Sequence, residues 1–355
     1  MRNAPAVDAA GRIYLAAQGR LCALALEEGG PKLLWEYVLG SHVPGAVVLA
    51  ADETLRVHSA DGFLHAVTSE GKQVWPPAKV GEPLGWAAPV SDEGGNTWIS
   101  AYDGGLIRVD AAGKTSGRRY FRSRSKFDSA GIILHGVLYI GSEDGYVFAI
   151  RLDADRGENV WDHAADEGFT GGFVNSSPAV APDGTLVVAA RDELLFGFAA
   201  GGATVWKTPM PGQLLGSPVV DPHGHVYLGV SQARRGEEAR GLLVSVDGNS
   251  HKIRWQYAAT GPVESTPVIG EDGVIYFGDN AGTIHAVDNR GSALWTAAVG
   301  AAVRSAGTIL AAEQLAFGLD DGTLVALRCS SAALAQGGWP KVAGNPAQSG
   351  LAGGN

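Results

Sequence analysis

The sequence predicts an all-β protein, an eight-bladed β-propeller of four-stranded antiparallel blades, on two observations. Short runs of β-branched and aromatic residues alternate with turns rich in Gly, Asp, Asn and Pro along all 355 residues, which is the pattern of strands joined by tight turns. The stretch DGVIYFGDNAGTIHAVDNRGSALW, residues 272–295, also recurs with a period of roughly 44 residues, and four short strands per period of that length are typical of a propeller blade.

Each copy consists of four apolar runs, and the fourth run ends in an aromatic residue. In the first copy AGRIYLAAQGRLCALALEEGGPKLLW ends at Trp35, and in the second DETLRVHSADGFLHAVTSEGKQVW ends at Trp75. The third copy has lost its Trp, and Tyr120 or Phe121 takes that position. The remaining copies end at Trp161, Trp206, Trp255, Trp295 and Trp339. A large flat indole with a free N–H suits docking of one blade on the next, so these Trp residues are interpreted as structural.

The whole chain is predicted to form one domain. A single blade leaves both faces of its sheet uncovered, whereas a closed ring of eight covers each face with a neighbour. The predicted blades are 1–41, 42–83, 84–125, 126–171, 172–212, 213–260, 261–300 and 301–355.

Composition limits the classes of partner. The net charge of −10 argues against nucleic acid, whose binders carry a basic surface, and no apolar run of about 18 residues could span a membrane. Cys22 and Cys329 lie far apart, which predicts free thiols. The start at Met1 lacks the regions of a secretory signal, so a cytoplasmic protein is expected, or an extracytoplasmic one if the start is trimmed. A monomer is expected.

The recurring pattern SPVVxxxGxVYxG…DGxxxAxDxxxGxxxW, with a terminal WPKVAGNPAQSG, resembles the PQQ-like, or quinoprotein-type, β-propeller repeat family over essentially the whole chain. The resemblance implies the fold but no single activity. The family includes quinoprotein alcohol dehydrogenases, an outer-membrane assembly lipoprotein that acts as a scaffold, sensor domains of kinases, and stand-alone members.

The resemblance also gives a test for the quinone cofactor. Quinoprotein dehydrogenases of the family hold PQQ in the central funnel between a disulfide of neighbouring cysteines and a Trp, with a calcium ion near a catalytic Asp. They are also longer. This sequence has no Cys-Cys pair and no Cys-x-x-Cys-His haem attachment site, so neither a cofactor nor a metal is expected, and PQQ with calcium is disfavoured.

The first strand of each blade is expected to line the central channel. Its first residues then lie at a mouth shared with the turns between the second and third strands. With Glu264, three residues before Pro267, as the reference, the equivalent ring positions are Arg2, Pro44, Trp86, Asp128, Asn175, Leu215, Glu264 and Arg304.

This ring supports two interpretations. In the first, Asp128 and Glu264 are the general acid and base acting on a small molecule, with carboxyl pKa values split by a partly dry funnel. Trp86 would then pack on the substrate, and Asn175 and Arg304 would orient it. In the second, the channel is filled with water, and Asp128, Glu264 and Arg304 form salt bridges.

The sequence favours a scaffold that presents loops to a protein or peptide, without bound PQQ. The alternative is a cofactor-independent enzyme of small-molecule biosynthesis with its ligand in the central funnel, and a PQQ-dependent dehydrogenase ranks third. The basic run GRRYFRSRSK, 117–126, suits an acidic partner or an exposed linker. The charged loop SQARRGEEARG, 231–241, either covers the mouth or is a solvated insertion. His65 and His285 share one repeat position, which indicates blade architecture.

Overall fold

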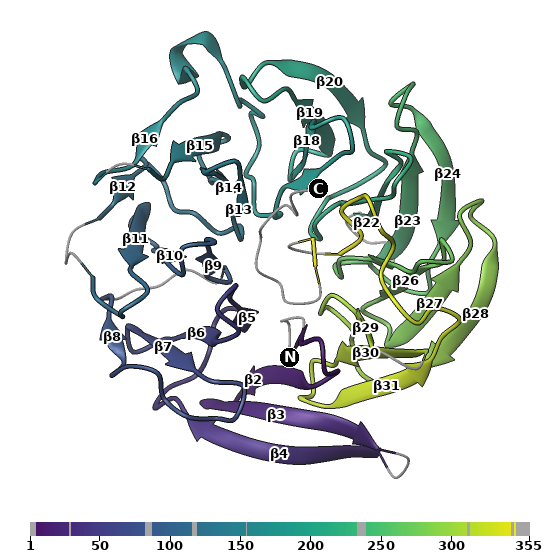
Figure 1. The fold of residues 1–355 in the computed structure, drawn as a ribbon. Helices are drawn as coiled ribbons and strands as arrows, with labels where there is room; N and C mark the ends of the chain where they lie inside the picture. The colour runs from purple at the N-terminus through teal and green to yellow at the C-terminus, as the bar shows by residue number, and fades with distance from the viewer. Residues whose placement is uncertain are drawn as a thin grey trace.

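The computed structural model describes residues 5–27, 30–81, 87–115, 119–153, 155–232, 239–310, 313–341 and 344–345. They form eight antiparallel sheets arranged as a ring around a central opening (Figure 1), which confirms the predicted eight-bladed β-propeller. Seven sheets have four strands, and the eighth has three within the described residues. In this part of the chain the only helix is the short 3-10 helix η1 (His163–Ala165), and no helix is long and apolar enough to cross a membrane.

Each sheet is built from consecutive strands, ordered from the channel outward. Blades one to four contain β1 (Ala6–Val7), β2 (Ile13–Ala17), β3 (Arg20–Glu27), β4 (Gly30–Val38); β5 (Val48–Leu49), β6 (Leu55–Ser59), β7 (Phe63–Val67), β8 (Ala78–Lys79); β9 (Val90–Ser91), β10 (Thr97–Ser100), β11 (Gly105–Val109), β12 (Phe121–Arg122); and β13 (Ile132–Leu134), β14 (Val137–Gly141), β15 (Val147–Arg151), β16 (Glu158–Asn159). Blades five to eight contain β17 (Ala179–Val180), β18 (Leu186–Ala190), β19 (Leu194–Phe198), β20 (Thr204–Pro209); β21 (Val219–Val220), β22 (Val226–Gln232), β23 (Arg240–Val246), β24 (Ile253–Ala258); β25 (Val268–Ile269), β26 (Ile275–Gly278), β27 (Thr283–Val287), β28 (Ala293–Ala298); and β29 (Thr308–Leu310), β30 (Gln314–Gly318), β31 (Leu324–Arg328).

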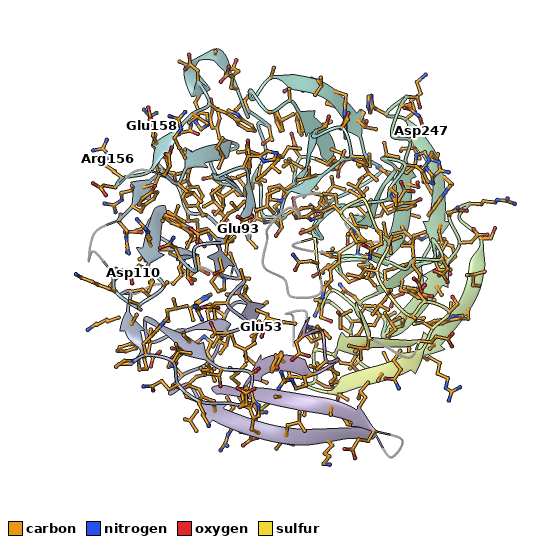
Figure 2. The ribbon with its side chains drawn as sticks, in the orientation of Figure 1. Glu53, Glu93, Asp110, Arg156, Glu158 and Asp247 are labelled. Atoms are coloured by element: carbon orange, nitrogen blue, oxygen red, sulfur yellow. The ribbon has the colours of Figure 1, made fainter. Side chains whose placement is uncertain are left out.

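This strand order sets which residues can reach the channel. Glu53 and Glu93 follow the short inner strands β5 and β9 and lie beside the central opening, whereas Glu158 of the outer strand β16 lies at the rim (Figure 2). Residues that begin or end the first strand of a blade are therefore the ones that line the channel.

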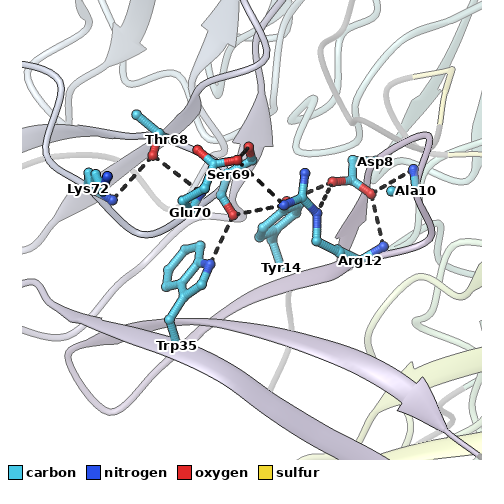
Figure 3. Close-up of polar contacts among 9 residues, drawn as sticks. All are labelled: Asp8, Ala10, Arg12, Tyr14, Trp35, Thr68, Ser69, Glu70 and Lys72. Carbon is cyan, nitrogen blue, oxygen red and sulfur yellow. Dashed lines mark hydrogen bonds and ion pairs between the residues drawn. The ribbon is translucent and has the colours of Figure 1, made fainter.

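Aromatic side chains dock several blades on the next. The Trp35 indole N–H donates to the Ser69 carbonyl in blade two over 2.9 Å (Figure 3). A Cβ on Gly71 would lie 2.7 Å from the Trp35 ring, and Gly71 has a φ of +81°, so this turn requires glycine for both its conformation and the close approach. Trp161 and Trp255 donate to carbonyls of their following blades in the same way.

Blade three makes this contact with a tyrosine. The Tyr120 hydroxyl donates to the Arg151 carbonyl in blade four over 3.1 Å. A Cβ on Gly157 would lie 2.7 Å from the Tyr120 ring, just as one on Gly71 would crowd Trp35. Tyr120, rather than Phe121, therefore occupies the position of the missing Trp.

The eighth copy departs from the repeat. The sequence predicts that Trp339 ends the fourth run of blade eight, but Trp339 instead forms an antiparallel bridge with Val220 of β21 in blade six. Consecutive glycines make this approach possible, because a Cβ on Gly338 would lie 2.5 Å from the Val220 carbonyl oxygen. The C-terminal segment, residues 330–341, thus crosses to the inner strands of other blades and adds no strand to blade eight.

The same segment helps to close the ring. Lys341 is fully buried, and its Nζ donates to the Pro5 carbonyl over 3.3 Å and to Thr308 Oγ1 of β29 over 2.9 Å. Val7 of blade one and Leu310 of blade eight belong to one hydrophobic cluster at the same junction. Burial lowers the pKa of Lys341 to about 7, since nothing as polar as water solvates the ammonium there.

Candidate functional site

The ring lies at the end of the channel where the second strand of each blade turns into the third. A repeated backbone hydrogen bond holds it there, because the second residue of that turn donates its N–H to the carbonyl two residues before the ring position. This bond joins Glu143 to Lys126, Asn280 to Pro262, Asp320 to Ala302, Ala60 to His42 and Arg191 to Phe173, over 2.8–3.2 Å. Each turn therefore contributes a side chain to the mouth.

Asp128 and Glu143 of blade four pair with the Lys126 ammonium, and these three residues, together with Asn175 and Tyr102, define the Lys126 cluster. Lys126 Nζ lies 3.0 Å from Asp128 Oδ2 and 3.1 Å from Glu143 Oε1. Asn175 Nδ2 donates to the same Glu143 oxygen over 3.5 Å. The ring of Tyr102, from blade three, lies 4.9 Å from Lys126 Nζ, within the range of a cation–π contact.

Asp128 is the member of this cluster whose carboxylate is buried with one oxygen unpaired in the described part of the chain. Burial raises the pKa of Asp128 and the neighbouring Glu143 adds to the effect, although Lys126 opposes it. Asp128 Oδ1 is buried without a hydrogen-bond partner among the described residues, and so is Asn175 Oδ1. Buried polar atoms of this kind are rare and point to water or a ligand.

A second group, the Arg304 cluster, joins blades seven and eight. Glu264 Oε1 accepts a hydrogen bond from Asn280 Nδ2 over 2.7 Å, and Glu264 Oε2 lies 3.1 Å from Arg304 Nε. The Arg304 guanidinium also pairs with Asp320. Both oxygens of Glu264 are therefore committed, which leaves this carboxylate poorly placed to act as a free base.

The structure groups the ring residues differently from either sequence interpretation. Glu264 pairs with Arg304 as the salt-bridge interpretation expects, but Asp128 pairs with Lys126 and not with Arg304. No hydrogen bond or ion pair in the described part of the chain joins the two clusters. Arg2 and Trp86 lie outside the described residues; Pro44 is buried, and Leu215 is half-buried. The catalytic roles of Asp128 and Glu264 and the binding roles of Trp86, Asn175 and Arg304 remain predictions.

Sequence reasoning missed the turn residues. Glu143, Asn280 and Asp320 each hold the second position of a turn, in SEDG, DNAG and LDDG. Their shared position, two residues before the turn glycine, is the signal that would have placed them beside the ring.

An exposed aromatic pair lies next to the Lys126 cluster. Between Trp161 and Asn175 the chain has five residues more than the equivalent segments of blades five, six and seven. The longer segment, residues 162–174, contains η1 and a loop and is termed the blade-four insertion. Phe169 and Phe173 on this insertion are 40% and 50% exposed.

The blade-four insertion is fixed to the blade beneath it. Thr170 donates from both its backbone N–H and its Oγ1 to the Gly145 carbonyl, over 2.8 and 3.0 Å. The Phe169 ring packs on Tyr146 at 4.9 Å between centroids, and Tyr146 stacks on His163 at 4.2 Å. The Phe169 ring is thus packed on the blade, and the backbone of Phe173 is held by the Arg191 N–H, which donates to the Phe173 carbonyl over 3.0 Å.

The opposite end of the channel holds a cavity of about 1370 Å³. Its walls are the turns between first and second strands together with the C-terminal segment. Residues from five blades and from this segment line it, among them Val7, Asp92, Ile133, Val180, Ile309 and Trp339. This cavity lies at the end of the channel opposite to Asp128, Asn175, Glu264 and Arg304.

Residues of two further sequence motifs are paired with residues of their own blades. Arg119 and Arg122 of the basic run lie 3.1 and 3.2 Å from Asp103, and His65 contacts Ser59 over 3.1 Å. Residues 116–118 and 233–238, which include parts of the basic run and of the charged loop, lie outside the described residues. Within the described ranges no group of three or more His, Cys, Asp and Glu could hold a metal ion, and both cysteines are free.

Comparison with known proteins agrees with the geometry. The family model for outer membrane protein assembly factor BamB matches residues 150–235 and 224–337, just over half of the chain. No curated protein matches the chain.

Similar solved structures include BamB from Moraxella catarrhalis (16% identity, TM-score 0.69, 92% of this chain and 96% of that one). The computationally designed Ika8 protein (14%, 0.72, 92% and 95%) and quinohemoprotein alcohol dehydrogenase from Comamonas testosteroni (14%, 0.69, 90% and 70%) are also similar. At such identities the structural likeness shows the fold alone. The repeat pattern, the eight sheets and the family match together establish that the chain belongs to the PQQ-like β-propeller family.

Proposed function

We propose that the protein is a binding scaffold for another protein or a peptide, and that the partner docks on the mouth face at blades four and five. The observation that carries this proposal is the pair of exposed rings, Phe169 and Phe173, on the blade-four insertion. Large aromatic side chains held in place are the usual anchors of protein interfaces, because little conformational entropy is lost when they bind.

The surroundings of the two rings suggest what the partner presents. Asp192 packs against Gly172 of the insertion, and burial raises the pKa of Asp192. Asp144 has a buried carboxylate oxygen without a hydrogen-bond partner in the described part of the chain. A partner that places an apolar side chain on Phe173 and a lysine or arginine beside these carboxylates would complement both features.

Family membership supports the same class of function. The matching family model is described as an assembly factor, a class of protein that works by binding other proteins. A quinohemoprotein alcohol dehydrogenase shares this fold, so the fold alone does not decide between binding and catalysis.

A photo-crosslinking experiment tests the docking face. The crosslinking amino acid benzoylphenylalanine replaces Phe173 in one variant and Val205 in another, since Val205 is 59% exposed on the outer strand β20. We expect a protein adduct at position 173 that is absent at position 205. The amount of the crosslinked protein that co-purifies with the Phe173→Ser variant should be roughly tenfold lower than with wild type. The amount that co-purifies with the Val205→Ser variant should equal that with wild type. Adducts of equal yield at both positions, or recovery unaffected by Phe173→Ser, would reject the proposed face.

We further propose that the scaffold works without bound PQQ. Cys22 lies on β3 and Cys329 follows β31, so the two thiols do not provide the disulfide of neighbouring cysteines. At the mouth Lys126 and Arg304 already neutralise carboxylates that a calcium ion would need. PQQ added with calcium should leave the melting temperature unchanged, and a rise of several degrees would contradict this.

One observation favours the enzyme alternative, namely the raised pKa and unpartnered oxygen of Asp128 beside Glu143. A buried carboxyl group whose pKa is raised can hold a proton and release it to a neighbouring group. Native mass spectra of protein purified gently from its own host test this. A small-molecule adduct lost in an Asp128→Asn/Glu264→Gln variant would favour catalysis, whereas a protein partner retained by that variant favours the scaffold.

A further inference from the structure

The C-terminal segment shows how the channel wall binds an extended chain. Val220 of β21 exchanges two hydrogen bonds with Trp339, each 2.8 Å long. Ile269 of β25 receives one from Ala335 over 3.0 Å and donates one to the Pro340 carbonyl over 2.8 Å. In blades six and seven, therefore, the inner edge of the sheet forms one β-bridge each with an extended chain, which is the contact that strand addition uses.

Other blades present the same edge at the same register. In an antiparallel ladder the N–H and C=O of one residue point to the same side, and successive residues alternate. The Ala181 N–H bonds outward to Thr185, so the backbone of Val180 points into the channel, as that of Val220 does. In blade four Leu134 closes the turn to β14 with Val137, so the backbone of Ile133 points into the channel.

These two edges have no backbone partner on the channel side among the described residues. Ile133 is 5% exposed, and buried backbone groups are nearly always bonded to protein or to water. Both residues line the cavity of about 1370 Å³. That volume exceeds the ~300–1,000 Å³ of typical small-molecule pockets and suits a peptide strand.

The charge of the cavity selects among peptides. Its described lining includes the carboxylates of Asp8, Asp92, Glu93 and Asp153 and no lysine or arginine. Asp8 is engaged by Arg12 and Tyr14 (Figure 3), and Asp92 by backbone and side-chain donors of Asn96. Glu93, which lies beside the opening (Figure 2), and Asp153 remain to attract a cation.

We propose that this end of the channel binds an extended peptide segment of a partner protein, rich in lysine or arginine, by strand addition to the inner edges of blades four and five. The peptide continues around the wall from the C-terminal segment, and its cationic side chains approach Glu93 and Asp153. This site is separate from the mouth face proposed above and does not depend on it.

The test uses a fluorescein-labelled eight-residue peptide of alternating valine and lysine, with a valine–glutamate peptide as control. We expect an anisotropy rise with the basic peptide only. Val180→Pro should abolish it, because proline removes the channel-facing N–H without breaking a bond to β18. Val180→Ala, which keeps that N–H, should bind as wild type. Glu93→Gln/Asp153→Asn should weaken binding roughly tenfold.

Hydrogen exchange locates the peptide. Binding should protect the amides of Ile133 and Val180, while the amide of Val220 is protected already without peptide. No affinity for the basic peptide, equal affinity of the Val180→Pro variant, or protection confined to other blades would each overturn the proposal. Because Phe173→Ser should leave this binding unchanged, failure here and failure of the mouth-face proposal give different results.

Discussion

The two ends of the channel are built from the same repeat but carry different chemistry. At the mouth the groups are side chains, and the charged ones are mostly paired with one another, as in the Lys126 and Arg304 clusters. At the opposite end the groups are backbone edges around a cavity, and a segment of the same chain already occupies two of them. The first end suits recognition of particular side chains, whereas the second suits recognition of an extended backbone.

This difference follows from the geometry of a blade. The turn between second and third strands folds over the start of the first strand, so its residues add side chains to the mouth. At the other end the first strand simply ends in a tight turn, as at Ala181–Gly184, and its inner edge stays open. Variation in the turns between second and third strands therefore changes the mouth, while at the opposite end an added chain can also pair with the inner edges.

The largest effect is expected from removing the anchor of the C-terminal segment. Trp339 is 4% exposed within a cluster that spans blades four to six. Trp339→Ala should lower the free energy of unfolding by about 3–5 kcal/mol, as measured by urea denaturation, and Trp339→Phe should recover part of the loss. A loss below about 1 kcal/mol would show that this segment is not part of the core.

Lys341 gives the next largest effect, with a defined pH dependence. Burial lowers the pKa of Lys341 from 10.5 to about 7, so between these values the unfolded chain binds a proton that the folded chain does not. The free energy of unfolding therefore rises with pH in this window, by on the order of 2 kcal/mol from pH 7 to pH 9.

Urea denaturation at pH 7, 8 and 9 measures this slope. Lys341→Met should abolish it, because methionine fills a similar space and does not titrate in this range. The matched control is Lys252→Met at an exposed lysine, which should keep the wild-type slope. An equal slope in both variants would assign the pH dependence to other groups.

The sequence was sufficient for the fold because the repeat encodes it locally. Strand runs, turn glycines and docking aromatics recur in each copy, and even Tyr120 could be assigned from spacing as one of two residues. Trp339 shows where this reasoning fails. Its spacing matches a blade, but the flanking Gly337 and Gly338 allow an approach to Val220 that no local pattern reveals.

The candidate site was predicted less well than the fold. The ion pair of Glu264 with Arg304 could be expected, because both residues lie at equivalent points of neighbouring blades. The partner of Asp128 was missed, since Lys126 reaches it from two residues earlier in the connection between β12 and β13. Which charges meet across a mouth depends on side-chain length and direction, and spacing along the sequence does not contain that information.

The smallest predicted effect is a change in the free energy of unfolding that has opposite signs in the two mouth clusters. The raised pKa of Asp128 means that the folded protein binds this proton more tightly than the unfolded chain. The free energy of unfolding therefore falls as pH rises above the ordinary value of 3.8. Asp128→Asn removes that fall and should stabilise the protein at pH 7, whereas Glu264→Gln weakens the pair with Arg304 and should destabilise it, each by about 1 kcal/mol or less.

Urea denaturation of both variants at pH 5 and pH 7 in low salt makes the comparison. The gain from Asp128→Asn should be smaller at pH 5, where part of the wild-type carboxyl is already protonated. If both variants lose stability equally at pH 7, Asp128 is as well satisfied by Lys126 as Glu264 is by Arg304 and Asn280. The unpartnered oxygen of Asp128 would then no longer mark the Lys126 cluster as the reactive side of the mouth. The exposed rings of the blade-four insertion would instead be the main feature that distinguishes this side of the mouth.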